Sequence, residues 1–205
     1  MREARVPATA EKSSYLGRML IYLAGPEVFL PDADALSDAK RSICARHGAI
    51  GIFPTDPIAC PEADRTKEGW FAIYLRNEAH IRRADALIAN LTPFRGPSAD
   101  PGTVYELGFM RALGRPVAGY SNAASSFLDR TRDFLGGAAR QRADGDWEDA
   151  EGLHIESFGL HDNLMIDGGL RAAGNSLVAR AVPEAARWRD LSAFEEALLA
   201  LLKSL

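Results

Sequence analysis

The sequence predicts an α/β fold, doubly wound around a parallel sheet of about five strands with flanking helices. Two observations predict it. Short apolar runs of strand length alternate with segments of helical periodicity along residues 19–120, and Gly, Pro or Asp residues separate them. Strands that alternate with helices form parallel sheets, because each helix carries the chain back across the sheet in a right-handed crossover.

The strands are predicted from length and punctuation, since short apolar runs bounded by turn residues are typical of buried strands. Five runs have this form: MLIYLAG (19–25), AIGIF (49–53), ALIANL (86–91), PVAGY (116–120) and IESFGL (155–160). The last of these is expected to supply the fifth strand.

Helices are predicted where apolar residues recur at helical spacing. The predicted helices are 32–48, a segment from Trp70 to Ile81, 103–113, and two closing helices in NSLVARAVPEA (175–185) and LSAFEEALLALLKSL (191–205). Asp32 can cap the first, Gly48 can end it, and Gly114 closes the third. The second helix is marked by Trp70, Ile73, Tyr74, Asn77 and Ile81.

The 205 residues suit one domain, predicted at 17–205. Residues 1–16 are expected to be a disordered tail, and they lack the apolar run of a signal peptide. The polar, mixed-charge segment 121–152 is expected to be a surface insertion with partial helix. No run is long and apolar enough for a transmembrane helix, so no membrane association and a cytoplasmic location are predicted.

Composition excludes several classes of function. The net charge of −4 argues against binding a nucleic acid polymer, which usually requires a basic excess. Two cysteines, Cys44 and Cys60, are too few for a disulfide scaffold and form no metal-binding spacing. No metal site is therefore expected.

Ligands of such sheets bind beyond the carboxyl ends of the strands. Three predicted loops lie there: AGPEVF (24–29), FPTDP (53–57) and TPFRGPSADPG (92–102). Asp85 differs, because it comes at the start of the third strand or the end of the preceding helix, so topology alone does not place it at this edge. The AGP turn matches neither a dinucleotide-binding nor a P-loop pattern, and Gly25 would let a ligand approach the backbone or would merely form a tight turn.

Glu106 is the most informative charged residue, because it lies early in an otherwise apolar helix. Thr103 and Glu106 fit a capping box, and Asp100 followed by Pro101 fits an N-cap with proline at the first helical position. On spacing alone, the cap is the commoner explanation. The alternative is a nucleophile that the positive end of the helix dipole keeps ionised, as attack on an anomeric carbon needs.

The ordered set of IYLAGPEVF (21–29), ADALIANLTPFRG (84–96), DPGTVYELG (100–108) and DNLM (162–165) resembles the nucleoside 2-deoxyribosyltransferase family. The resemblance covers most of residues 19–168. It implies a flavodoxin-like fold and cleavage of an N-glycosidic bond without a cofactor. The expected partners are a 2′-deoxynucleoside and a free nucleobase.

The resemblance also implies roles for individual residues. Glu106 stands at the position of the nucleophile, and Tyr22 at that of the tyrosine that orients it. Asp85 is expected to meet the nucleobase and help proton transfer, and Asp100 to hold the sugar 5′-hydroxyl. In the family, the segment that Asn163 and Met165 match reaches into the neighbouring subunit's site, although an Asn in a turn explains Asn163 equally well on local grounds. A homodimer or larger homo-oligomer with shared sites is therefore expected.

The remaining predictions concern the base and the acceptor. The loops near Phe29, Phe53 and Trp70 are expected to supply the base pocket, with no preference for purines or pyrimidines evident. The second enzyme class that fits is an N-hydrolase acting on nucleosides or nucleoside 5′-monophosphates, in which water replaces the second base. Phosphate-binding residues are absent from AGPEVFLPDAD (24–34), which favours a free nucleoside. A non-catalytic nucleotide-binding module would keep the loops but would not need Glu106.

Overall fold

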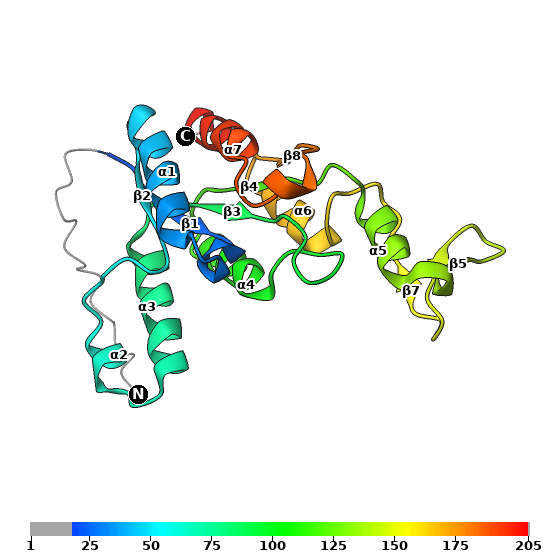
Figure 1. Cartoon of the computed structure of the whole chain (residues 1–205), viewed down its shortest axis with the longest axis horizontal. Helices are drawn as coiled ribbons and strands as arrows, with labels where there is room; N and C mark the ends of the chain where they lie inside the picture. The colour runs from blue at the N-terminus through cyan, green and yellow to red at the C-terminus, as the bar shows by residue number, and fades with distance from the viewer. Residues whose placement is uncertain (1–17, 205) are drawn as a thin grey trace, which may run out of the picture.

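A computed structural model describes residues 18–204, so the predicted tail at 1–16 lies outside the described residues. Five parallel strands form the central sheet in the order β2-β1-β3-β4-β8 (Figure 1). They are β1 (Leu20–Ala24), β2 (Ile50–Ile52), β3 (Ala86–Asn90), β4 (Val117–Ser121) and β8 (Leu177–Ala179). This is the strand order of a flavodoxin-like doubly wound fold, which confirms the predicted fold class.

Helices follow the strands in the predicted alternation. The α-helices are α1 (Ala33–Arg46), α2 (Pro61–Arg65), α3 (Gly69–Arg83), α4 (Pro101–Ala112), α5 (Phe127–Leu135), α6 (Leu164–Ala172) and α7 (Ser192–Lys203). Three short 3-10 helices are η1 (Pro26–Phe29), η2 (Gly136–Ala138) and η3 (Glu184–Ala186). Among the described residues, no helix is long and apolar enough to cross a membrane.

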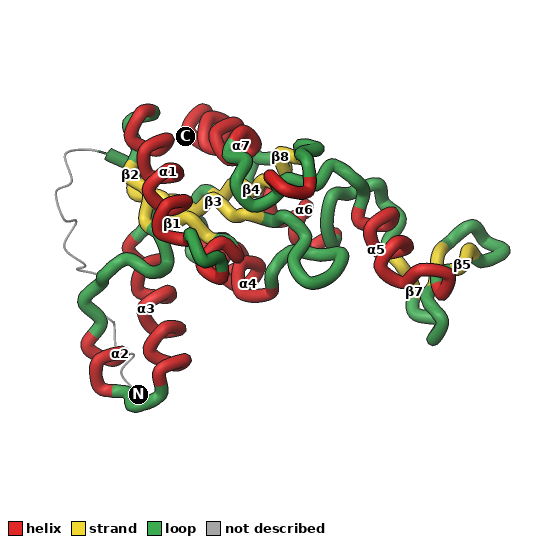
Figure 2. Tube along the Cα trace, viewed as in Figure 1, coloured by secondary structure: helices red, strands yellow, loops and turns green. Residues whose placement is uncertain are grey.

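The sheet has an apolar cluster on each face. Helices lie on either side of the strands (Figure 2). Alternate residues of a strand point to opposite faces, so Ile21 and Leu23 join one cluster while Tyr22 and Ala24 join the other. The first cluster packs against α1 and α7, and the second against α3, α4 and α6. The site therefore draws on the second face, which carries Tyr22.

Two predictions about the C-terminal half are wrong. The fifth strand is β8, which lies in the segment 175–185 that was expected to be a helix, and it pairs with β4. Residues 155–160 do not join this sheet, because Ile155 pairs with Trp147 in a separate sheet. β8 has only three residues, and such a short apolar run is ambiguous between strand and helix without its pairing partner.

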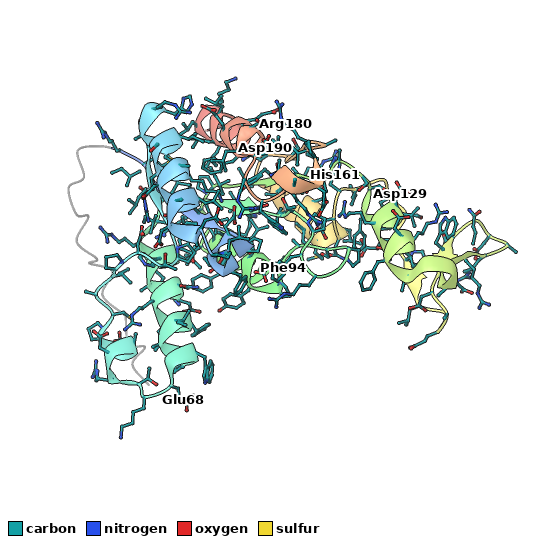
Figure 3. The ribbon with its side chains drawn as sticks, viewed as in Figure 1. Glu68, Phe94, Asp129, His161, Arg180 and Asp190 are labelled. Carbon is teal, nitrogen blue, oxygen red and sulfur yellow. The ribbon has the colours of Figure 1, made fainter. Side chains whose placement is uncertain are left out.

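The predicted insertion forms an arm that extends away from the body of the molecule (Figure 1). The arm contains α5 and a small antiparallel sheet of β5 (Arg140–Gln141), β6 (Trp147–Glu148) and β7 (His154–Ile155). β7 lies just beyond the predicted boundary at residue 152, so the arm is longer than the predicted insertion. Figure 3 shows Asp129 on this arm, well apart from Phe94 in the body. None of the side chains of α5 is buried, so the arm contributes little to the central core.

Candidate active site

Helix α4 begins with the N-cap that the sequence predicts at Asp100. Its carboxylate Oδ2 accepts hydrogen bonds from the backbone N of Thr103 at 2.8 Å and from the Thr103 hydroxyl at 2.9 Å, and Pro101 follows at the first helical position. The alternative capping box is therefore wrong, because Thr103 is already inside the helix. Glu106 is left without a capping role.

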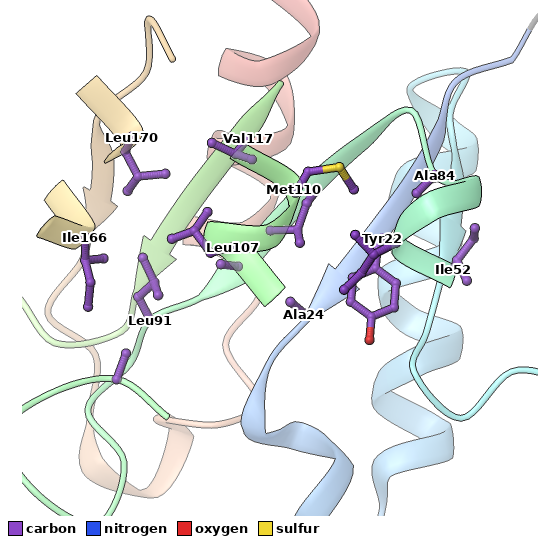
Figure 4. Packing of buried hydrophobic residues seen from close by; sticks show 14 of the residues in the cluster. Tyr22, Ala24, Ile52, Ala84, Leu91, Leu107, Met110, Val117, Ile166 and Leu170 are labelled. Atoms are coloured by element: carbon purple, nitrogen blue, oxygen red, sulfur yellow. The ribbon is translucent and has the colours of Figure 1, made fainter. Parts of the chain in front are cut away.

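Glu106 instead points toward the sheet and a neighbouring helix. Its Oε1 accepts a hydrogen bond from the Tyr22 hydroxyl at 2.7 Å and one from Asn77 Nδ2 at 3.3 Å. Figure 4 shows Tyr22 in the apolar cluster with its hydroxyl pointing away from the labelled apolar side chains. No described residue donates a hydrogen bond to Glu106 Oε2. One oxygen is thus fixed, and the other is available to a ligand.

Burial controls the ionisation of Glu106. The side chain is 8% exposed. Desolvation, with a smaller contribution from the charge of Asp100, raises its pKa to about 7, while the hydrogen bonds from Tyr22 and Asn77 oppose the shift. The expectation that the helix dipole keeps Glu106 ionised is therefore wrong in direction, since desolvation dominates. Burial beside Glu106 also raises the pKa of Tyr22, which therefore remains a hydrogen-bond donor.

Glu106 lines a cavity of about 340 Å³ between α3 and α4. The other lining residues are Trp70, Ile73, Tyr74, Asn77, Glu78, Ile81, Gly102 and Tyr105. The Tyr74 and Tyr105 rings lie 6.2 Å apart, and both hydroxyls donate to Glu78 Oε1, at 2.5 and 2.7 Å. Trp70 is 70% exposed and offers a flat ring at one end. Aromatic faces around a single buried carboxylate suit a planar ligand.

Asn77 lines this cavity and contacts Glu106, and the sequence did not predict this contact. A signal was present, because Asn77 is a polar residue at helical spacing with Trp70, Tyr74 and Ile81. Spacing alone could not show that this face of α3 meets Glu106, which is 29 positions away in the sequence. Its amide Oδ1 accepts no hydrogen bond from any described residue, so it can also contact a ligand.

Asp85 lies at the amino-terminal end of the strands, just before β3 begins. Its Oδ2 accepts a hydrogen bond at 2.9 Å from the backbone N of Leu20, where β1 begins. The site loops follow the other ends of β1 and β3, and Asp85 does not line the cavity of Glu106. The structure therefore does not bring Asp85 together with Glu106, and no contact of a described residue supports the proton-transfer role expected for Asp85.

The loop after β1 brings Gly25 and Phe29 to the carboxyl edge of the sheet. A Cβ on Gly25 would lie 2.0 Å from Glu27 Oε2 and 2.9 Å from Asn90 Cβ, so packing requires glycine here. Phe29 is 60% exposed and stacks on Phe94 of the loop after β3, with ring centroids 5.5 Å apart. Phe53 is fully buried in the core, whereas Trp70 lines the cavity. Of these two residues, only Trp70 fits the expected base pocket.

Asn163 and Met165 lie at the start of α6 and not beside Glu106. Asn163 caps α6 by accepting from the backbone N of Met165 at 3.0 Å, and it donates to Glu156 at 2.5 Å. Both residues line a second cavity of about 720 Å³, on the other side of α4 and mostly apolar. Within one chain, the segment is therefore separate from the cavity of Glu106.

These geometric features can be compared with known proteins. The family model for nucleoside 2-deoxyribosyltransferase matches residues 21–165, which include Tyr22, Asn77, Asp100, Glu106 and Asn163. The chain belongs to the nucleoside 2-deoxyribosyltransferase family. A solved structure of a Leishmania mexicana 2-desoxiribosyltransferase is similar at 32% identity and a TM-score of 0.54, over 72% of this chain and 85% of that chain.

Two curated relatives are similar in sequence. An uncharacterized protein of Schizosaccharomyces pombe is 35% identical over 75% of this chain and 78% of its own length. A methylthioribose-1-phosphate isomerase of Anaeromyxobacter is also 35% identical, over 71% of this chain but only 41% of its own length. The family and fold support an enzyme of the nucleoside deoxyribosyltransferase type.

We expect Asn77→Ala to lower kcat/KM about tenfold, since a hydrogen bond to a charged group contributes about 1.5 kcal/mol. Loss of the amide should also raise the pKa of Glu106 further, because its hydrogen bond favours the carboxylate. The pH profile of kcat/KM, measured for both proteins, should therefore move to higher pH in the variant.

Asp85→Asn is the matched control, because an amide oxygen can still accept from Leu20. We expect it to leave kcat/KM and the pH profile close to wild type. Selective slowing of substrates with poor leaving groups in Asp85→Asn would instead restore Asp85 to the acid role.

Proposed function

We propose that the protein transfers 2-deoxyribose between nucleobases through a covalent deoxyribosyl ester on Glu106. The observation that carries the proposal is the state of this carboxylate. It is buried at a cavity wall, one oxygen is held by Tyr22 and Asn77, and the other receives no hydrogen bond from any described residue. An oriented carboxylate with one available oxygen is suited to nucleophilic attack.

In the first step, Glu106 Oε2 attacks C1′ of a 2′-deoxynucleoside. The bond between C1′ and the base nitrogen breaks, its electron pair leaves with the base, and water supplies the proton that the departing base takes up. The transition state has oxocarbenium character, as in retaining glycosidases. Asp100 caps α4, and its Oδ2 lies beside Gly102, which lines the cavity. This carboxylate is proposed to hold the sugar 5′-hydroxyl.

In the second step, a nitrogen of another base attacks C1′ from the face that the first base left. The ester bond to Glu106 breaks, the carboxylate is regenerated, and the proton of the incoming base passes to solvent. Two inversions give net retention of configuration. Tyr22 orients Oε1 throughout, and the aromatic rings of Trp70, Tyr74 and Tyr105 provide stacking surfaces for either base.

Base exchange tests the proposal against its alternatives. 2′-Deoxyinosine is incubated with the protein, with and without free adenine, and the products are separated by chromatography. Appearance of 2′-deoxyadenosine supports a transferase. Release of free deoxyribose alone would indicate an N-hydrolase, and unchanged substrate with measurable binding would indicate a non-catalytic module.

We expect 2′-deoxynucleosides to react at least tenfold faster than ribonucleosides. The electron-withdrawing 2′-hydroxyl destabilises the developing oxocarbenium ion, which slows bond cleavage at C1′. Initial rates with inosine and 2′-deoxyinosine at equal concentration provide the comparison. Equal rates would contradict the deoxyribosyl preference without removing Glu106 from the chemistry.

We expect kcat/KM to rise with pH through about 7, the pKa to which burial raises Glu106. The protonated acid is a poor nucleophile, so activity requires the carboxylate that predominates above this pKa. Rates measured from pH 4 to 9 should give an acidic limb with a midpoint near 7. A midpoint near the ordinary carboxyl value would contradict control of this limb by a Glu106 carboxyl with a raised pKa.

The proposed enzyme is a homodimer or larger homo-oligomer with shared sites. Two features support this: Asn163 and Met165 lie apart from the cavity of Glu106 in their own chain, and they border a large apolar cavity on α4. Met165 is 75% exposed at the start of α6. A second copy that covers this surface would bury the apolar residues and could bring Asn163 to the neighbouring site.

A further inference from the structure

Glu27 is a buried carboxylate that the proposed chemistry does not use. It lies in η1, directly after β1, and is 1% exposed. Its Oε1 accepts hydrogen bonds from Lys40 Nζ, from Asn90 Nδ2 at 2.8 Å and from the Tyr120 hydroxyl at 2.9 Å. These donors belong to α1, β3 and β4, so one oxygen connects three elements to the loop after β1.

A gain in stability does not by itself explain the buried charges of Glu27 and Lys40. Glu27 and Lys40 form an ion pair in which both side chains are 1% exposed. Removing two charges from water costs several kcal/mol per ion, and apolar residues of similar volume often stabilise a core equally well. Lys40 Nζ also lies over the rings of Tyr120 and Phe194, 5.4 and 5.3 Å from their centroids. A net gain in stability therefore does not explain why this position carries charged residues.

The cluster reaches both loops that follow β1 and β3 at the carboxyl edge of the sheet, where ligands of this fold class bind. On one side, Glu27 Oε2 packs against Gly25, where a Cβ would come within 2.0 Å of it. On the other side, Asn90 Oδ1 accepts from the backbone N of Thr92 at 3.0 Å and so holds the start of the loop after β3. Beyond the cluster the same two loops meet again through the stacked rings of Phe29 and Phe94.

We propose that Glu27 is a positioning residue, which holds the loops 25–30 and 91–98 in register at the carboxyl edge of the sheet. It acts through Asn90 and through the backbone at Gly25, and it does not touch the substrate. The expected consequence for catalysis rests on the proposed function, because it assumes that these loops bind the deoxynucleoside. The consequence for loop structure does not.

The test compares two double variants that both lack the buried charge pair. Glu27→Gln/Lys40→Met keeps an acceptor for Asn90 and Tyr120, whereas Glu27→Leu/Lys40→Met removes it. We expect the Leu variant to raise KM for a deoxynucleoside about tenfold with a smaller change in kcat, and the Gln variant to keep KM within about twofold of wild type. A purely structural role would change the folded fraction and leave KM the same in both.

Hydrogen exchange of the backbone amides gives a readout that needs no activity. In the Leu variant, amides of 25–30 and 91–98 should exchange faster than in the Gln variant, while amides of β1 and β3 remain protected. If the wild-type protein shows no base exchange, the proposed function fails, but this comparison still tests the positioning role. Equal KM and equal loop exchange in the two double variants would overturn it.

Asn90→Ala provides the second variant if Glu27→Leu/Lys40→Met does not fold. It breaks the link to Thr92 and leaves the ion pair of Glu27 and Lys40 in place. We expect faster exchange of 91–98 and little change in 25–30. Unchanged exchange of 91–98 in Asn90→Ala would also overturn the proposal, because the link through Asn90 would then hold nothing in place.

Discussion

Replacement of Glu106 by Ala should leave a folded protein with almost no transferase activity. Ala removes the carboxylate that Tyr22 and Asn77 hold at the cavity wall, so no ester with the sugar can form. Loss of a covalent nucleophile typically lowers kcat by on the order of 10³-fold or more. The measurement is the rate of base exchange per folded molecule, with folding checked by circular dichroism.

The matched variant Glu106→Gln separates catalysis from stability. In the wild type, burial raises the pKa of Glu106 in the folded protein to about 7, above its ordinary value. The protonated carboxyl therefore contributes to the free energy of unfolding at pH values below its ordinary pKa. This contribution is lost as the pH rises through about 7. Gln carries no charge to desolvate, so Glu106→Gln should be more stable than wild type at pH 8 by up to about 3 kcal/mol, with no such gain at pH 4.

Both results are needed for the assignment. A catalytic carboxylate kept in a desolvating site is expected to lower stability, and its neutral replacement to raise stability while abolishing activity. Full activity in folded Glu106→Ala would remove the covalent mechanism. Equal stability of Glu106→Gln and wild type at pH 8 would show that burial does not raise the pKa of this carboxyl.

Mixing two inactive variants should restore activity if sites are shared between subunits. Glu106→Ala lacks the nucleophile. Asn163→Ser lacks the amide but keeps a side-chain oxygen that can cap α6. In a mixed dimer, the subunit that retains Glu106 receives an intact Asn163 from its partner, so one of the two sites is complete. The activity of the mixture, after dissociation and reassociation, should rise well above that of either variant alone.

The control is the same mixture without dissociation, which contains no mixed dimers. Native mass spectrometry of the reassociated sample establishes that mixed dimers formed. Absence of recovered activity in that sample would show that Asn163 serves its own subunit or only caps α6. The chemistry proposed for Glu106 would be unaffected, because it does not depend on which subunit supplies the amide.

The sequence by itself determined the strands that carry the site and the start of α4. A run such as ALIANL is a buried strand in almost any context, because its length, apolar character and flanking turn residues all favour one structure. Asp100 with Pro101 is equally local, since an N-cap and the proline after it interact within a single turn. The ordered motifs around these elements were sufficient to indicate the family.

The tertiary structure decided the features that depend on residues far apart in the chain. The short run Leu177–Ala179 became a strand because β4 offered a free edge, and the sequence could not show that edge. Asn77 contacts Glu106 because α3 packs beside α4. Asp85 does not line the cavity of Glu106, because it lies where β3 begins. The raised pKa of Glu106 follows mainly from burial. Desolvation depends on how the surrounding fold buries the carboxyl, so no local sequence pattern could predict the direction of this pKa shift.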